Sequence, residues 1–273
     1  MRSGARTGAI ARLRARLGHL ARRPATRPSP TVPNPSVAPP VLSPELPLPP
    51  TRLRAGGTNF RADTDFLATA TREATRLVAD AGFSRPLRVL DLGCGAGRLA
   101  YGLIEIDAPI ARYDGVDVMA PQIDWCVQQV TRRHPEYRFT TIDVYNERYN
   151  PGGARAASDT ALPLESASYD VAYAYSVFSH LLSADVRAYL VEFARLLVPG
   201  GIAMVTGFIE EDVPDEMVNP PGYLEEAWGG PLHCVRYARA YIATMARDAG
   251  MAVERFEHGE EANGQSRLIL RRA

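Results

Sequence analysis

Residues 89–100 read VLDLGCGAGRLA and carry the strongest structural signal in the chain. An apolar run that ends in the acid Asp91 is followed by glycines at positions 93, 95 and 97, which alternate with small residues. A glycine-rich turn between a strand and a helix lets a ligand approach the backbone closely, and nucleotide-like cofactors bind there in α/β proteins. The stretch therefore predicts a strand, a ligand-binding turn and a helix, in that order.

Strand-like and helix-like segments alternate along the chain from residue 51. The residue patterns predict helices over 63–81, 98–106, 123–130, 183–197 and 237–249, and strands over 88–93, 113–118, 139–144, 169–177, 202–208, 251–257 and 267–271. This alternation is typical of an α/β fold with a parallel, doubly wound, Rossmann-like sheet. Ligands of such sheets bind at the carboxyl ends of the strands, so we expect the site beside the first strand.

The first 50 residues differ in composition from the rest. They carry eight arginines against one acid, whereas the remainder carries 23 arginines against 30 acids. Eleven of the 22 prolines fall in residues 24–50, which favours an extended, solvated linker. We therefore predict a disordered basic tail over 1–50 and a single domain over 51–273. The apolar spacing within residues 10–20 indicates either a solvated tail or a surface helix that touches an anionic membrane or a partner protein. The arginine-rich, acid-poor start is also similar to an organelle transit peptide, so this interpretation stays open as well.

The composition also limits the chemistry. All 31 basic residues are arginine, so no lysine is available for a Schiff base, a P-loop or general-base catalysis. The acidic body is a poor match for a polyanion, and nucleic acid is not the expected substrate. The three cysteines are far apart and lack metal-site spacing, and no apolar run reaches the length of a membrane span. These features predict a cytoplasmic location.

The glycine turn departs from the dinucleotide fingerprint G-x-G-x-x-G, because Arg98 stands where the last glycine would be. Asp91 would repel a pyrophosphate lying on the helix N-terminus. A positively charged ligand suits it better, and S-adenosylmethionine (SAM) carries a sulfonium and an ammonium but no phosphate. Asp117 and Asp143 end the next two predicted strands, where carboxylates can bind ribose hydroxyls and the adenine amino group. Three acids at three successive strand ends favour SAM as the cofactor.

Taken together, the segments VLDLGCGAG, GVDV, IDV and LVPGG resemble the class I SAM-dependent methyltransferases over roughly residues 60–273. The resemblance implies a seven-stranded sheet in the order 3-2-1-4-5-7-6, with the last strand antiparallel. The shorter segments IDWC, YNPGG and SVFSHL are similar to a bacterial subgroup often found among small-molecule or glycan methyltransferases. The C-terminal stretch GEEANGQSRLILRRA does not match that subgroup.

The resemblance also implies roles for single residues. Its cofactor-binding positions correspond to Asp91, Gly93, Gly95, Gly97, Asp117, Val118, Asp143, Val144 and Ser176. The acid Asp91, the glycine turn and Ser176 would hold the methionine end. Asp117 and the neighbouring Val118 would lie at the ribose, and Asp143 with the backbone of Val144 at the adenine.

His180, just past the fourth predicted strand, is the candidate general base for a hydroxyl acceptor, or alternatively a helix-start residue bonded to the backbone. The segment 209–235 is either a substrate lid or a surface insertion. Its candidate substrate contacts are Tyr223, Trp228 and His233. No acidic cluster follows the fourth predicted strand, so we expect no metal ion.

The sequence thus predicts metal-independent methyl transfer from SAM to a small-molecule or sugar acceptor, at an oxygen. Two alternatives stay open on the residues alone. One is an aminopropyltransferase, which uses decarboxylated SAM on the same fold. The other is a non-enzymatic SAM-binding protein whose basic tail recruits a partner.

Overall fold

A computed structural model gives the structure of the protein and describes residues 46–54, 60–82, 84–159, 161–261 and 263–273. The chain divides into two units, 1–38 and 39–273, and every described residue lies in the second. The predictions of disorder and of membrane or partner contact for the tail therefore fall outside the described residues, apart from its last five positions.

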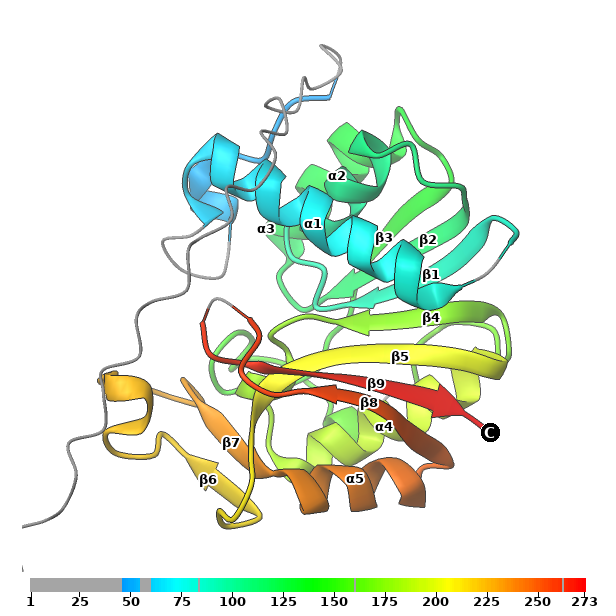
Figure 1. The fold of residues 1–273 in the computed structure, drawn as a ribbon. Coiled ribbons are helices and arrows are strands. Elements are labelled where there is room, and N and C mark those ends of the chain that lie inside the picture. Colours follow the sequence, from blue (N-terminus) through cyan, green and yellow to red (C-terminus); the bar gives the residue numbers. More distant parts are fainter. Residues whose placement is uncertain (1–45, 55–59, 83, 160, 262) are drawn as a thin grey trace, which may run out of the picture. The chain divides into compact units, whose positions relative to one another are not determined.

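The central sheet of this unit is parallel and is built around β1 (Leu87–Leu92). β1 lies between β2 (Ile110–Asp117) and β4 (Tyr169–Ala174). β3 (Tyr137–Thr141) extends the sheet beyond β2, and β5 (Leu197–Glu210) extends it beyond β4 (Figure 1). β1 and β4 are buried almost throughout because helices cover both faces, which explains their near-continuous apolar sequences.

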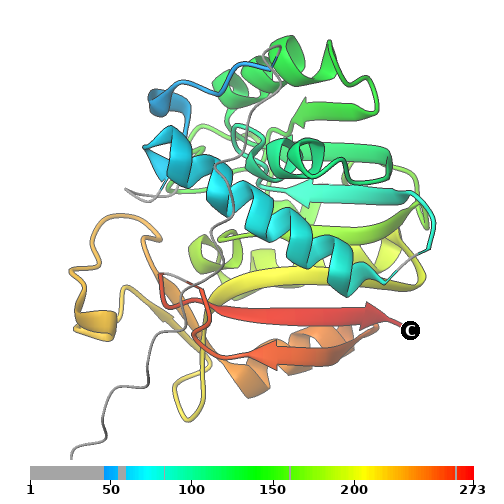
Figure 2. The same ribbon diagram turned by 45° about the horizontal axis from the view of Figure 1, so that its top comes forward.

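Two antiparallel strands complete the sheet. β9 (Ser266–Arg272) pairs with β5, and β8 (Met251–Glu257) pairs with β9. Figure 2 shows β9 in red between β5 in yellow and β8 in orange. With β8 and β9 counted as the sixth and seventh strands, the order is 3-2-1-4-5-7-6 with an antiparallel last strand. The predicted fold and its strand order are confirmed.

The segment between β5 and the last helix contains two strands that the sequence pattern did not predict. β7 (Val235–Ala238) runs parallel to the last three residues of β5, and β6 (Glu216–Val218) pairs antiparallel with β7. These strands have three and four residues, too few to show a period of two. Part of the candidate lid is therefore paired, as short strands, with the end of β5.

Helices cover the two faces of the sheet. They are α1 (Asp63–Ala81), α2 (Arg98–Glu105), α3 (Ala120–Cys126), α4 (Ser183–Leu196) and α5 (Arg239–Asp248). A π-helical turn over Val127–Thr131 continues α3, and short 3-10 helices lie at Thr51–Leu53, Ala157–Asp159, Phe178–His180 and Tyr223–Glu225. Val89 of β1 packs in one core with α1, α2 and α3, whereas the next residue, Leu90, packs in the other core with α4 and α5. Alternate strand residues therefore serve opposite faces.

The last residues of the predicted tail are packed against the domain. Leu46 is buried in the same core as α1 and α2. The Tyr101 hydroxyl donates a hydrogen bond of 2.6 Å to the Pro47 carbonyl, and Arg54 Nε donates one of 2.7 Å to the Pro49 carbonyl. The ordered domain thus includes residues 46–50, five positions before the predicted boundary. No helix in the described ranges is long and apolar enough to cross a membrane.

Candidate active site

A cavity lies where the carboxyl ends of β1, β2 and β4 meet, the place expected for a ligand of this sheet. Of the nine predicted cofactor-binding residues, seven line it: Asp91, Gly93, Gly95, Asp117, Val118, Val144 and Ser176. The two others, Gly97 and Asp143, do not line it. The sequence therefore brings most of its candidate residues together on one surface.

The glycine turn after β1 has a backbone that side chains disfavour. Gly93 has φ of +72°, and a Cβ atom there would lie 2.5 Å from Cγ2 of Val177. Gly97 has φ of +81° and is the N-cap residue of α2, where a Cβ atom would lie 3.1 Å from Sγ of Cys126. Because these positions need positive φ and close approach, they favour glycine. Gly97 therefore shapes the start of α2 from outside the cavity.

The Asp117 carboxylate holds the glycine turn in place. It accepts hydrogen bonds from the backbone N–H of Gly95 at 2.8 Å and of Met119 at 2.9 Å. Burial raises the pKa of Asp117, and these backbone donors partly offset that rise. The side chain thus joins the end of β2 to the turn that follows β1.

The Asp91 carboxylate is buried at the end of β1 and accepts a hydrogen bond from the Tyr113 hydroxyl. Burial raises the pKa of Asp91 to about 7, and the Tyr113 bond and the charge of Arg98 partly offset the rise. In the described part of the chain Asp91 forms no ion pair. A bound cation would therefore favour its ionised form.

Asp143 lies outside the cavity for a reason of strand geometry. β3 ends at Thr141, earlier than the predicted strand end at residue 144. Ile142 and Val144 are buried and line the cavity, so Asp143 between them is exposed, and its carboxylate accepts a hydrogen bond of 3.2 Å from the Ala154 N–H. The geometry gives no support to a contact between this carboxylate and adenine, and that role stays a prediction.

His180 lines the same cavity, as do Tyr145, Asn146, Tyr149, Asp185 and Tyr189. Its Nδ1 lies 2.9 Å from the Leu232 carbonyl. Because a carbonyl only accepts, Nδ1 carries the hydrogen and Nε2 is the basic nitrogen of the neutral ring. Burial lowers the pKa of His180 to about 4, although the bond to Leu232 opposes the shift. His180 is therefore neutral at pH 7.

Residues 90–205 match the family described as a methyltransferase domain. The chain is 34% identical over 116 residues to a ubiquinone biosynthesis O-methyltransferase of Methylocella silvestris. The matched residues cover 42% of this chain and 38% of that protein. The chain therefore contains a methyltransferase domain, which includes residues 90–205. It spans about two fifths of the length of the curated relatives it matches first. A Mycolicibacterium smegmatis relative described as a probable S-adenosylmethionine-dependent methyltransferase is 27% identical over 61% of this chain and 52% of that protein, which supports SAM as the cofactor.

Solved structures share the fold of this methyltransferase domain. The 1,6-didemethyltoxoflavin-N1-methyltransferase of Burkholderia thailandensis, solved with S-adenosylhomocysteine, is 18% identical with a TM-score of 0.52 over 76% of this chain and 79% of that one. The cyclase SpnF is 20% identical with a TM-score of 0.54 over 79% of this chain and 84% of that one. At these identities the likeness shows the fold alone, so function must be argued from the site.

The polar atoms that line the cavity of the methyltransferase domain are suited to the polar and charged groups of SAM. Two buried side-chain atoms on it, Arg98 Nη1 and Gln122 Oε1, have no hydrogen-bond partner among the described residues. One is a charged donor and the other an acceptor, and SAM carries a carboxylate together with ribose hydroxyls and an ammonium. The carboxylates of Asp91 and Asp117 add negative charge for its cationic groups. A buried polar atom without a partner is costly, so these atoms favour a polar ligand.

Tyr223, Trp228 and His233 do not line the cavity. They pack against one another and Phe208: the Phe208 ring lies 5.7 Å from Tyr223 and 5.3 Å from Trp228, and Trp228 lies 5.1 Å from His233. The 209–235 segment instead reaches the site through the Leu232 carbonyl that binds His180. Direct substrate contact by the three aromatic residues stays a prediction.

The C-terminal stretch that did not match the subgroup contributes to the site. Gln265 Nε2 donates a hydrogen bond of 2.8 Å to Ser176 Oγ, and Thr206 Oγ1 donates one of 2.8 Å to Gln265 Oε1. Ser176, which lines the cavity, has φ of +57° and is also held through its N–H by Thr206. Asn263, from the turn before Gln265, lines the cavity as well. No local pattern in the sequence signals these long-range contacts.

No cluster of three or more His, Cys, Asp or Glu side chains suited to a metal ion occurs among the residues that the structure describes.

Proposed function

We propose that the protein transfers the methyl group of SAM to a hydroxyl oxygen of a small-molecule or sugar acceptor, without a metal ion. The observation that carries the proposal is that one cavity joins the Asp91 and Asp117 carboxylates to the neutral imidazole of His180. The similarity to the Methylocella silvestris relative, a ubiquinone biosynthesis O-methyltransferase, supports transfer to oxygen.

We assign two roles to the side chains of the cavity: some bind the cofactor, and one accepts the proton of the acceptor hydroxyl. SAM, when bound, supplies a methyl group activated by the positive charge on sulfur. Asp91 and Asp117 offer negative charge and hydrogen-bond acceptors to the cofactor, and the rigid glycine turn fixes its position. Holding the acceptor oxygen in line with the methyl group then provides much of the rate.

His180 is the proposed general base. The bond from Nδ1 to Leu232 leaves Nε2 as the only acceptor of the ring. An oxygen that gains a methyl group becomes strongly acidic, so a base with a pKa of about 4 suffices to take its proton. The ring also needs no deprotonation beforehand at neutral pH.

We assign the acceptor to the part of the cavity lined by His180, and Tyr145, Tyr149 and Tyr189 line this cavity as well. Tyr149 meets the His180 ring edge to face, with centroids 5.4 Å apart. Tyrosine rings offer apolar faces together with a polar tip, which suits a small ring that carries hydroxyl groups. This composition supports a phenolic or sugar acceptor.

All three cysteines are unpaired and buried, which supports the proposed cytoplasmic location.

The proposal predicts that Asp117→Ala weakens binding of S-adenosylhomocysteine at least tenfold. The substitution removes a carboxylate from the cavity and frees the N–H of Gly95 that it holds. Isothermal titration calorimetry measures the change, and tenfold corresponds to about 1.4 kcal/mol. Asp124→Ala is the matched control, because its exposed carboxylate on α3 does not line the cavity and its removal is expected to leave the affinity unchanged. Lack of binding by the wild-type protein would contradict the proposed function.

His180→Ala is expected to lower kcat by roughly 100-fold and leave S-adenosylhomocysteine affinity unchanged, since general-base catalysis contributes about that factor. Turnover is measured on a panel of phenolic and sugar probes. At saturating SAM, the wild-type kcat is expected to show no inflection near pH 6.5 that depends on His180, because this side chain stays neutral down to about pH 4. Full activity in His180→Ala, or an inflection near pH 6.5 that this variant abolishes, would count against the assigned role or protonation state.

A further inference from the structure

His180 lies in the loop 175–182, which joins β4 to α4 and has a strained backbone at one position. Ser176 has φ of +57°, in the left-handed region that residues with a side chain disfavour. The 3-10 helix Phe178–His180 begins two residues later, so the backbone at Ser176 sets the direction in which His180 is presented. A residue keeps such a conformation only where its surroundings hold it. The loop therefore depends on contacts from other segments.

Gln265, the residue before β9, supplies such contacts. Its Nε2 donates hydrogen bonds of 2.8 Å to Ser176 Oγ and 3.3 Å to Ser179 Oγ. Its Oε1 accepts a bond of 2.8 Å from Thr206 Oγ1, which in turn accepts the Ser176 N–H at 2.7 Å. Gln265, Ser179 and Thr206 are buried, so breaking these bonds would leave polar groups without partners, which is costly. One amide thus holds both Ser176 and the residue that directly precedes His180.

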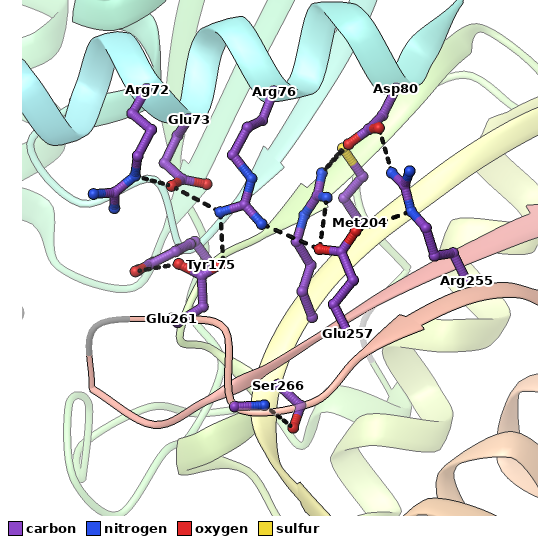
Figure 3. Close-up of polar contacts among 12 residues, drawn as sticks. Arg72, Glu73, Arg76, Asp80, Tyr175, Met204, Arg255, Glu257, Glu261 and Ser266 are labelled. Carbon is purple, nitrogen blue, oxygen red and sulfur yellow. Dashed lines mark hydrogen bonds and ion pairs between the residues drawn. The ribbon is translucent and has the colours of Figure 1, made fainter. Parts of the chain in front are cut away.

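The turn that carries Gln265 has anchors of its own. This β8–β9 turn, residues 258–261 and 263–265, is closed by a backbone hydrogen bond of 3.1 Å from the Glu261 N–H to the Gln265 carbonyl. The Glu261 side chain is almost fully buried and pairs with Arg76 of α1 at 2.8 Å (Figure 3). It also accepts a hydrogen bond of 3.2 Å from the Tyr175 hydroxyl. Because Tyr175 directly precedes Ser176, the turn contacts two neighbouring residues of the loop.

Arg76 belongs to a wider set of ion pairs, shown in Figure 3, that join α1 to the strands beside the turn. Arg76 pairs with Glu257 of β8 at 3.2 Å, and Glu257 pairs with Arg267 of β9 at 3.2 Å. Arg267, whose side chain is 4% exposed, also pairs with Asp80 of α1. These pairs do not involve Gln265. We therefore expect a substitution of Gln265 to remove the bonds to the loop and leave the turn in place.

We propose that Gln265 is a positioning residue for His180, because it holds Ser176 and Ser179 so that the imidazole Nε2 is directed at the acceptor oxygen. Two other bonds hold His180 itself: Asn146 Nδ2 donates to its carbonyl at 3.0 Å, and Leu232 binds its ring. Gln265 adds the direction of the backbone that leads into His180. The inference rests on the proposed function. A displacement of about 1 Å in a reacting group can cost roughly 100-fold in rate, so the effect is measurable.

The first experiment measures kcat at saturating SAM in Gln265→Met and His180→Ala, alone and combined. Methionine resembles glutamine in shape but cannot make the same hydrogen bonds. Gln265→Met is expected to lower kcat by roughly 10- to 100-fold. In the His180→Ala background it is expected to cause no further loss, because residues that act through one another are not additive. A merely structural role would lower kcat by the same factor in both backgrounds.

Ser266→Ala is the matched control, because Ser266 is the next residue of the chain and is also buried. Its hydroxyl donates to the Ile209 carbonyl at 2.9 Å and accepts the Gly259 N–H at 3.1 Å, so it binds the hairpin and not the loop 175–182. This substitution is expected to lower the Tm and leave kcat unchanged. It thereby separates loss of stability from displacement of His180.

The imidazole of His180 gives a second readout that needs no acceptor. Nitrogen-15 NMR of histidine-labelled protein distinguishes the two neutral tautomers, and His180→Ala identifies the signal of this ring. In the wild-type protein the bond to Leu232 predicts one tautomer, with the hydrogen on Nδ1. In Gln265→Met the ring is expected to populate both tautomers, whereas Ser266→Ala keeps one. If Gln265→Met does not fold, Ser179→Ala removes one acceptor of the amide and is expected to show a smaller change of the same kind.

An unchanged kcat or a single tautomer in Gln265→Met overturns the inference, as do equal losses of kcat with and without His180. Full activity in His180→Ala instead overturns the role of the proposed base. If the wild-type protein binds S-adenosylhomocysteine but turns over no phenolic or sugar probe, the proposed acceptor chemistry is wrong, and the tautomers alone decide the inference.

Discussion

Asp91→Asn is expected to weaken cofactor binding by 100-fold or more while making the free protein more stable at pH 8. Burial raises the pKa of Asp91 from its usual value to about 7. The folded protein therefore binds a proton that the unfolded chain has lost between about pH 4 and pH 7, and its free energy of unfolding falls as the pH rises through that range. Above pH 7 the full cost of the buried charge is present. A neutral amide of similar shape removes it and can still accept the Tyr113 bond.

The expected gain in stability at pH 8 is roughly 2–4 kcal/mol and vanishes below about pH 4, where the carboxyl is protonated in both states. Urea unfolding at pH 4 and pH 8 measures it. Asp114→Asn is the matched control, because this buried acid also accepts a tyrosine hydroxyl but is paired with Arg112, outside the cavity. That control is expected to be destabilised. Destabilisation of Asp91→Asn at pH 8 would show that the Asp91 charge is already satisfied in the free protein.

The same substitution is expected to reduce S-adenosylhomocysteine affinity by 100-fold or more at pH 8. The wild-type affinity itself should rise about tenfold per pH unit up to pH 7, since only the ionised carboxylate attracts an ammonium. Calorimetry in buffers of different ionisation heat detects the proton that binding releases. An affinity that does not vary between pH 5.5 and 8 would separate Asp91 from ammonium binding.

The contrast between Asp91 and Asp143 shows how far the sequence could predict the site. Both acids stand near predicted strand ends, but only Asp91 lines the cavity. β3 ends at Thr141, three residues earlier than predicted. Asp143 therefore lies between the buried residues Ile142 and Val144, and because side chains alternate along an extended chain, its carboxylate points outward. Motif order predicted the fold and the turn, because those depend on local pattern. The direction in which a single side chain points depends on the residue at which the strand ends, and no local sequence pattern defines that residue.

Other parts of the site depend on contacts between distant segments. Gln265 meets Ser176 across 89 positions of sequence, and Leu232 meets His180 across 52. In the sequence, Arg98 was notable only because it stands where the dinucleotide fingerprint has its last glycine. The rings of Phe60 and Tyr175, which lie 4.9 Å and 4.4 Å from its guanidinium, come from two separate segments. Such contacts are products of the folded sheet. A single sequence predicts the elements that carry these residues but not the partners that the fold gives them.

Gly102→Ala is expected to lower the stability of the domain by about 3 kcal/mol or more, the upper range for added volume in a packed core. In an ordinary helix this change would stabilise by up to about 1 kcal/mol, because alanine has the higher helix propensity. Here, however, a Cβ atom at position 102 of α2 would lie 2.1 Å from the Ala70 carbonyl oxygen of α1. The obstacle is backbone, which has no rotamer to adopt, so the two helices must move apart.

A fall in Tm of roughly 6–12 °C follows for a domain of this size, and thermal unfolding measures it. Gly152→Ala provides the control, since a Cβ atom there meets nothing within 4 Å. Separation of the helices would also move Arg98 on the first turn of α2, so S-adenosylhomocysteine affinity should fall together with stability. A Tm that rises in Gly102→Ala would mean that helix propensity outweighs the contact. The sign of this one measurement therefore tests whether close packing of α1 on α2 sets the geometry of the cofactor site.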